Sequence, residues 1–198
     1  MIHWCYRIAS LLFLFLLVAC SSTAPRLDKM APLPGNFTCR VAVLPFMGTG
    51  GYPRGAELFN KVFSTELVSA AAFQVVQEGD VLDLYRQLTI FPTQEPTLEQ
   101  LKIIGSRLGV QLFIGGDVLR MVERRSGRQV VTELTVVLRL YDGRTGKLLW
   151  ETYYKRRGKD YRAIMHFGRI NTITGLARRM SKEIINLWLE QGMNQCSK

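Results

Sequence analysis

The sequence has few of the residues that enzymes use for acid–base catalysis and metal binding. Its 198 residues include only two histidines, His3 and His166, and neither an H-E-x-x-H nor a G-x-S-x-G motif. Zinc proteases and α/β-hydrolases are built on these motifs, and isolated histidines do not supply a metal cluster. Among hydrolases, one built on two distant carboxylates stays compatible with the sequence. We therefore predict that the protein is not an enzyme and binds no metal.

A glycine-rich stretch also lacks the residues of a nucleotide site. Residues 48–55 read GTGGYPRG and follow an apolar run. A dinucleotide fingerprint G-x-G-x-x-G would need glycine where Pro53 stands, and a P-loop would need G-K-[ST], which is absent. We interpret the stretch as the connection between a strand and a helix, and we predict no nucleotide or other cofactor.

The apolar run near the N-terminus is too short to span a membrane. It covers Leu11–Ala19, whereas a membrane-spanning helix needs roughly 20 residues. Arg7 precedes it, and it ends in Leu17-Val-Ala-Cys20, which resembles the lipobox of bacterial lipoprotein signal peptides. The resemblance implies a cleaved signal peptide over residues 1–19 and acylation of Cys20. The alternative is an uncleaved anchor in which the cysteine is incidental.

The residues after Cys20 indicate location and domain boundaries. Ser21 stands where enterobacterial lipoproteins retained in the inner membrane carry Asp, which implies the periplasmic face of the outer membrane. Several acyl chains anchor a protein stably. Residues 20–38 contain three prolines and no apolar periodicity, so we predict a flexible tether with a reach of about 25 Å. Residues 39–198 then form one domain.

Acidic residues are scarce in the later part of the chain. Residues 120–182 hold sixteen Lys and Arg against five Asp and Glu, whereas residues 20–119 hold eight against nine. Export and the lack of nucleic-acid-binding motifs argue against a nucleic-acid partner. We predict that Arg156, Arg157, Lys159 and Arg162 bind an anionic surface, namely lipid or lipopolysaccharide phosphates or an acidic protein. The alternative is a solvated basic face that keeps the protein soluble.

Apolar periodicity predicts the order of the elements. The first half reads strand, helix, strand, helix, helix, which implies a βαβ unit with parallel strands. A T-x-x-Q pattern at Thr97 and a glycine at Gly109 bound its last helix. The second half predicts a strand from Val110 toward Val122, a turn at 124–128, antiparallel strands at 130–141 and 147–155, and an amphipathic helix at 174–191. The fold class is α/β: a mixed β-sheet with a βαβ N-terminal half, antiparallel hairpins and a C-terminal amphipathic helix.

This order resembles a known family. The segments VAVLPF, FQVVQEGD, LGVQLFIGGDV and LTVVLRLYDGRTGKLLWE are similar to the periplasmic α/β domain shared by CsgG, FlgO, LpoB and the TolB N-terminal domain. The resemblance implies a non-catalytic assembly or scaffold subunit of a flagellar or secretion machine, with an envelope protein or further copies of itself as partner. A CsgG-like oligomeric export channel is the alternative, and an envelope enzyme comes third. The connection at 123–128 is short and charged for a channel.

Two cysteines remain in the predicted domain. Cys5 leaves with the signal peptide and Cys20 takes the lipid, so Cys39 and Cys196 are left in an oxidising compartment. They flank the domain, and domain ends often lie close together. We predict a disulfide between them; the alternative is two unpaired thiols on frayed ends.

Overall fold

The computed structural model describes residues 24–35, 38–48, 51–52, 54–70, 73–127, 129–163 and 168–193. Cys20 and Cys196 lie outside these residues, so lipidation and the Cys39–Cys196 disulfide stay predictions. The described elements are β1 (Arg26–Lys29), β2 (Arg40–Val43), β3 (Met47–Gly48), α2 (Gly55–Ser69), β4 (Gln74–Val75), α3 (Glu78–Gln87), α4 (Leu98–Leu108), β5 (Leu112–Ser126), β6 (Gln129–Asp142), β7 (Leu148–Arg157), the 3₁₀ helix η1 (Gly158–Tyr161) and α5 (Ile173–Glu190).

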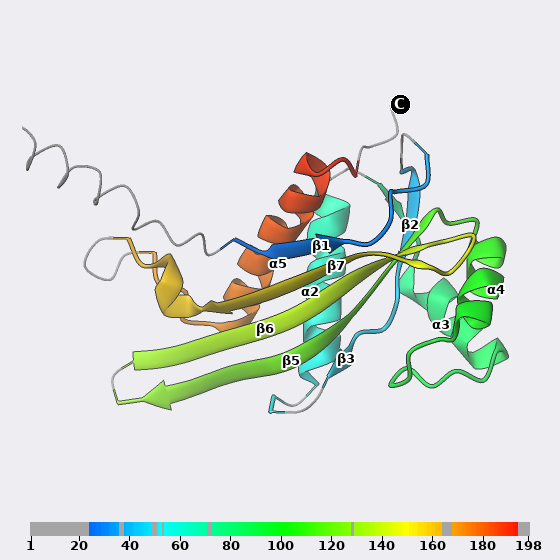
Figure 1. The fold of residues 1–198 in the computed structure, drawn as a ribbon. Coiled ribbons are helices and arrows are strands. Elements are labelled where there is room, and N and C mark those ends of the chain that lie inside the picture. The colour runs from blue at the N-terminus through cyan, green and yellow to red at the C-terminus, as the bar shows by residue number, and fades with distance from the viewer. Residues whose placement is uncertain are drawn as a thin grey trace, which may run out of the picture.

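One mixed sheet organises the fold (Figure 1). Its strand order is β1-β7-β6-β5-β2-β4, with β3 paired to β5. The pairs of β2 with β4 and β5, and of β3 with β5, are parallel, whereas β5–β6, β6–β7 and β1–β7 are antiparallel. The predicted class is thus confirmed: a βαβ first half, antiparallel hairpins and a C-terminal helix.

Local signals explain where the helices begin and end. At the start of α4, Thr97 Oγ1 accepts from the Gln100 amide at 3.3 Å, and Gln100 Oε1 accepts from the Thr97 amide at 2.8 Å. Gly109 ends α4 in the left-handed conformation, with φ of 62°, which glycine adopts without strain. Helix α5 begins after Thr172, whose hydroxyl accepts from the Gly175 amide at 3.2 Å.

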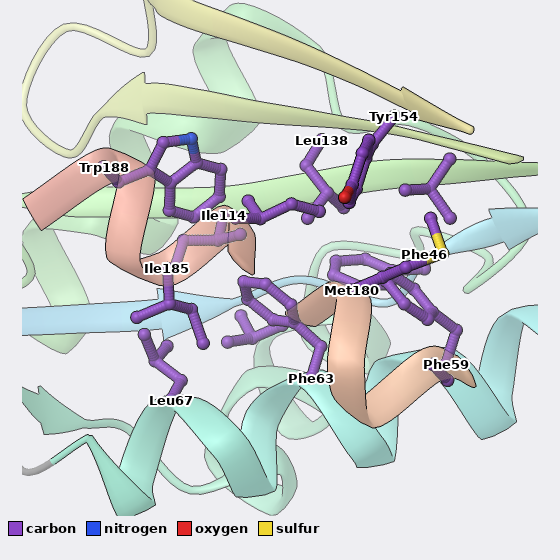
Figure 2. Packing of buried hydrophobic residues seen from close by; sticks show 14 of the residues in the cluster. Phe46, Phe59, Phe63, Leu67, Ile114, Leu138, Tyr154, Met180, Ile185 and Trp188 are labelled. Atoms are coloured by element: carbon purple, nitrogen blue, oxygen red, sulfur yellow. The ribbon is translucent and has the colours of Figure 1, made fainter. Parts of the chain in front are cut away.

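Helices α2 and α5 cover one face of the sheet and form the larger core with it (Figure 2). Aromatic rings of α2 meet α5 there, and the ring centroids of Phe63 and Trp188 lie 5.8 Å apart. The indole N–H of Trp188 donates to Thr152 Oγ1 on β7 at 2.8 Å, so this buried polar group has a partner. The apolar stripe predicted for the last helix therefore packs on the sheet.

Helices α3 and α4 lie on the opposite face, at one end only. Their smaller core takes Ala42 on β2, Leu44 just after β2 and Phe113 on β5, which alternate with residues of the larger core. The outer half of β5, β6 and β7 is covered by a described helix on one face alone. Its other face carries charged side chains grouped around Glu133.

Strand β1 lies within the segment that the sequence predicts to be a flexible tether. It pairs antiparallel with β7, from Arg26 opposite Tyr153 to Lys29 opposite Trp150. Leu27 and Leu33 pack against the larger core, and Lys29 Nζ lies 4.8 Å from the ring centroid of Trp150. The tether prediction over residues 20–38 is therefore corrected at Arg26–Lys29, which adds a strand to the sheet.

The β5–β6 hairpin is longer than predicted. The sequence predicts a turn at 124–128, but the ladder continues to the pair Ser126–Gln129. A register shift between Val118 and Arg120 marks a bulge. Beyond Glu133, where the pairing of β6 with β7 ends, β5 and β6 project as a two-stranded ribbon (Figure 1). The charged residues at 123–126 therefore belong to a strand.

Candidate functional site at the basic end of the sheet

Cationic side chains gather where β7 passes into η1 and where the β5–β6 hairpin turns. We call this region the basic end; it comprises Arg124, Arg125, Arg156, Arg157, Lys159, Arg162 and Arg169. The α3 and α4 helices lie at the opposite end of the molecule (Figure 1). All four residues predicted to bind an anionic surface fall in this region, but their surroundings differ.

Arg156 is held by aromatic and polar contacts. Its Nε donates to the Tyr154 hydroxyl at 2.8 Å, and its guanidinium carbon lies 5.3 Å and 5.2 Å from the ring centroids of Tyr154 and Tyr161. Cation–π contacts of this kind hold the guanidinium of a half-buried arginine in position. Arg156 therefore has a structural role, and its predicted binding of an anionic surface stays a prediction.

Glu183 on α5 organises the surroundings of Arg156. Its Oε2 accepts from the Tyr154 hydroxyl at 2.5 Å and from the Tyr161 hydroxyl at 2.6 Å, while Oε1 accepts from Arg179 Nε at 2.9 Å. Burial raises the pKa of both phenols, and their hydrogen bonds to Glu183 raise it further. Both hydroxyls therefore stay protonated and join β7 and η1 to α5.

Arg157 is partly neutralised. Its Nε lies 3.7 Å from Glu133 Oε2, and the same carboxylate meets Arg120 Nε at 3.3 Å and Lys155 Nζ at 3.6 Å. Three cations thus share one carboxylate. The three cations are about half exposed, so these ion pairs add little stability, and the group keeps a positive excess.

Lys159 and Arg162 are exposed and have no ion pair among the described residues. Arg124 and Arg125, at the hairpin tip, have the same properties, and the sequence-based prediction did not name them. The only signal for these two was the regional charge imbalance, because the prediction treated them as turn residues. Among the described residues of the basic end, the cations free to meet a ligand are therefore Arg124, Arg125, Lys159 and Arg162.

Other polar residues fix the hairpin to the body of the domain. Arg169 donates to Gln129 Oε1 at 2.7 Å and to the Val130 carbonyl at 2.6 Å. The amide of Ile173, at the start of α5, donates to Glu123 Oε2 at 2.5 Å. The projecting ribbon is therefore braced by the segment that leads into α5.

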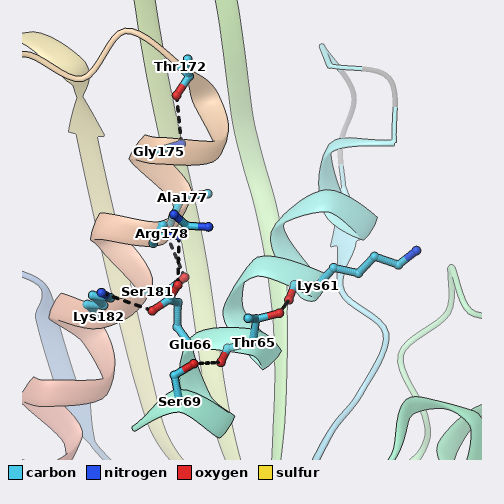
Figure 3. A network of polar contacts seen from close by, with 10 residues as sticks. All are labelled: Lys61, Thr65, Glu66, Ser69, Thr172, Gly175, Ala177, Arg178, Ser181 and Lys182. Carbon is cyan, nitrogen blue, oxygen red and sulfur yellow. Dashed lines mark hydrogen bonds and ion pairs between the residues drawn. The ribbon is translucent and has the colours of Figure 1, made fainter.

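A second polar cluster joins the two helices of the larger core (Figure 3). Glu66 on α2 is buried, and its carboxylate lies 3.1 Å from Arg178 Nε and 3.6 Å from Lys182 Nζ on α5. In the sequence, Glu66 is the charged member of an otherwise apolar helical stripe. The contacts explain it as a clamp between helices.

The glycine-rich loop borders a cavity of about 580 Å³. Phe46, Tyr52 and Met121 contribute apolar walls, beyond the carboxyl end of β2, where open α/β sheets commonly bind ligands. Its charged lining is Arg54, Glu57 and Glu78, and Arg54 Nε already contacts Glu57 Oε2 at 2.6 Å. Two carboxylates would repel a phosphate, so this geometry gives a nucleotide no support.

No group of three or more His, Cys, Asp or Glu side chains in the described part of the chain is placed to hold a metal ion. None of the described helices is both long and apolar enough to cross a membrane. Cys39 lies just before β2, where its amide donates to Gln111 Oε1 at 2.5 Å.

No protein-family model matches the sequence, and no curated protein matches it. Solved structures do match. The lipoprotein GNA1162 from Neisseria meningitidis has a TM-score of 0.52 at 18% identity, over 77% of this chain and 99% of that one. The chain shares its fold with a bacterial lipoprotein. PelC from Paraburkholderia phytofirmans, solved as a dodecamer, has a TM-score of 0.52 at 13% identity, over 82% and 94% of the two chains.

The C-terminal domain of LpoB from Escherichia coli matches with a TM-score of 0.46 at 13% identity, over 65% of this chain and 89% of that one. A TM-score of this size supports no argument, and identities of this size establish the fold alone. The resemblance inferred from the sequence holds at the level of the fold, which the chain shares with the lipoprotein GNA1162. Kinship with CsgG, FlgO and TolB stays a prediction.

Proposed function

We propose that the chain is a non-catalytic lipoprotein, anchored through Cys20 at the periplasmic face of the outer membrane. There its α/β domain serves as an assembly or scaffold subunit of a cell-envelope machine of flagellar or secretion type. The pairing of β1 with β7 carries this proposal, because it leaves only residues 21–25 between the predicted acylated cysteine and the sheet. The domain then works close to the membrane surface.

Two further observations support the proposal. A lipoprotein, GNA1162, has the same fold, and PelC, which also has it, was solved as a dodecamer. A scaffold subunit that associates with copies of itself fits this likeness. The described residues offer surfaces and polar networks but no metal-binding cluster, which favours a binding role over catalysis.

Crosslinking in intact envelopes tests the function. The full chain is expressed with a C-terminal tag, crosslinked, extracted in detergent and purified beside a Cys20→Ala control. We expect acyl mass on Cys20, and envelope proteins in fixed ratio that the control does not capture.

The size and composition of the extracted complex distinguish the scaffold role from the export channel. Extraction as a monomer without captured envelope proteins would contradict the scaffold role. A large, detergent-resistant ring of this chain alone would favour the export channel instead.

A further inference from the structure

The N-terminal strand enters the sheet facing the basic end. Strand β1 is antiparallel to β7, and its first residue, Arg26, lies opposite Tyr153. Strand β7 runs on from Tyr153 to Arg157 and then into η1. The start of β1 therefore points toward the basic end (Figure 1). A lipid on Cys20 would be attached from this side.

The reach of residues 20–26 is close to the length of the outer part of the β5–β6 hairpin. Tyr153 pairs with Val137 on β6, and from that level the hairpin continues eight residues to Gln129, or about 26 Å at 3.3 Å per residue. The six residue steps from Arg26 back to Cys20 span at most about 22 Å. A lipidated Cys20 can therefore reach the level of the outer hairpin, but not past its tip at Gln129.

The charge of this end complements an anionic membrane. Residues 120–133 and 155–169 hold ten Lys and Arg against three Asp and Glu, an excess of seven positive charges. Arg124 and Arg125 are consecutive strand residues, so they point to opposite sides of the ribbon, and both are exposed. Exposed cations spread around a tip suit a plane of phosphates, because each adds electrostatic attraction to an anionic surface.

We propose that the basic end is a membrane-contact surface, in which Arg124, Arg125, Lys159 and Arg162 meet the headgroups of anionic phospholipids. The domain then stands with its hairpin on the bilayer beside the acylated Cys20, and α3 and α4 face away from the membrane. This orientation rests on the proposed lipid anchor. Acyl chains hold the protein at the membrane, and the basic surface fixes which side of the domain faces the lipid.

Hydrogen exchange on the lipidated full chain tests the orientation. The protein is incorporated in nanodiscs of phosphatidylcholine alone or with 30% phosphatidylglycerol, and exchange is followed by mass spectrometry. We expect slower exchange at residues 123–127 and 158–163 in anionic discs only. The effect should disappear at high ionic strength, because exposed charges are screened. Residues 89–97, between α3 and α4, should exchange equally in both discs.

A matched pair of variants assigns the effect to the hairpin. Arg124→Gln with Arg125→Gln removes two charges from the tip. Arg144→Gln with Lys147→Gln removes two exposed charges from the β6–β7 turn at the opposite end. Each cation near an anionic surface strengthens contact about fivefold, so the hairpin pair should weaken protection roughly 25-fold and the turn pair should leave it unchanged.

The outcomes separate this inference from the proposed function. The intact mass of the same sample reports whether Cys20 is acylated. Acylated protein without lipid-dependent protection at the hairpin overturns the orientation alone, and unacylated protein overturns the anchor and the orientation with it. Protection that is equal in both lipids but grows with the number of chains per disc would show contact between copies, which also overturns the proposal.

Discussion

The two ends of the sheet are stabilised in different ways. At the end formed by β2, β4, α3 and α4, helices cover both faces, and Phe113 and Ile104 are wholly buried. At the basic end, described helices cover one face, and polar contacts such as those of Glu183 and Arg169 maintain the geometry. Residues 73–111 hold three basic and five acidic residues, a net charge of −2, against +7 for the basic end. Apolar packing thus builds one end and leaves the other available for charge.

The predicted disulfide should give the largest effect, and it would belong to the helix-covered end because Cys39 precedes β2. A bridge to Cys196 closes nearly the whole domain, for which the loop-entropy model gives about 4–5 kcal/mol. We expect urea unfolding of the Cys196→Ser variant to reveal a loss of this order. Cysteine alkylation of the denatured, unreduced wild type checks the bridge directly, since labelling of both Cys39 and Cys196 would rule it out.

Core truncation should affect the helix-covered end far more than the open face. Phe113→Ala removes a fully buried ring and should lower the free energy of unfolding by about 3–5 kcal/mol, because it loses apolar burial and leaves a cavity. Tyr153→Ala, where the side chain is 42% exposed, should cost less than about 1 kcal/mol. Urea denaturation measures both, and equal losses would refute the contrast.

Replacing either of two helical glycines with alanine should change the stability of the protein, in opposite directions for the two positions. A Cβ on Gly105 would lie 1.7 Å from the Gly143 carbonyl oxygen, whereas one on Gly79 would meet nothing within 4 Å. Gly105→Ala should therefore destabilise the protein by about 1–3 kcal/mol through overpacking. Gly79→Ala should stabilise it by about 0.5 kcal/mol, because alanine loses less backbone entropy. Thermal unfolding of both variants checks the sign.

The tyrosine network should give a smaller, pH-dependent effect at the basic end. Tyr161→Phe removes the hydrogen bond to Glu183 and should cost about 1 kcal/mol at pH 7. The folded pKa of Tyr161 is raised, so its contribution is complete below the unfolded value of about 10 and is lost as pH rises above it.

Urea unfolding at pH 8 and pH 10.5 should therefore show a smaller loss of stability for Tyr161→Phe than for wild type. Tyr153→Phe, at an exposed position on β7, serves as the control. An identical pH dependence in wild type and Tyr161→Phe would contradict the role assigned to the network.

Local signals predicted the elements that depend on their own residues. The Thr97–Gln100 capping pattern and Gly109 predict the two ends of α4, and the alternation of apolar residues predicts β6. The sequence does not predict strand β1, because Arg26–Lys29 contains a single apolar residue. The strand depends on pairing with β7, which is distant in the sequence. The sequence predicts a turn at the hairpin tip, because an exposed ribbon has no apolar alternation that would indicate a strand.

For the predicted site, too, local composition is informative and contacts between distant residues are not predicted. The charge imbalance located the basic end, and all four named residues lie there. It could not show that Arg156 is held between Tyr154 and Tyr161, because the network depends on Glu183, which lies far along the chain. Nor could it single out Arg124 and Arg125 as the exposed cations of the tip. Which cations are free depends on tertiary contacts, and composition reports only their number.

The antiparallel pairing of β1 has a mechanical consequence. A load applied through Cys20 would reach the domain at Arg26 and act along the strand, away from Lys29. The ladder bonds to β7 lie across the strand direction, so such a pull strains them together in shear and does not open them one at a time. The four residue pairs between β1 and β7 should therefore resist a force applied at Cys20. The same pairs would resist less well if the force were applied at Lys29 and separated them one at a time.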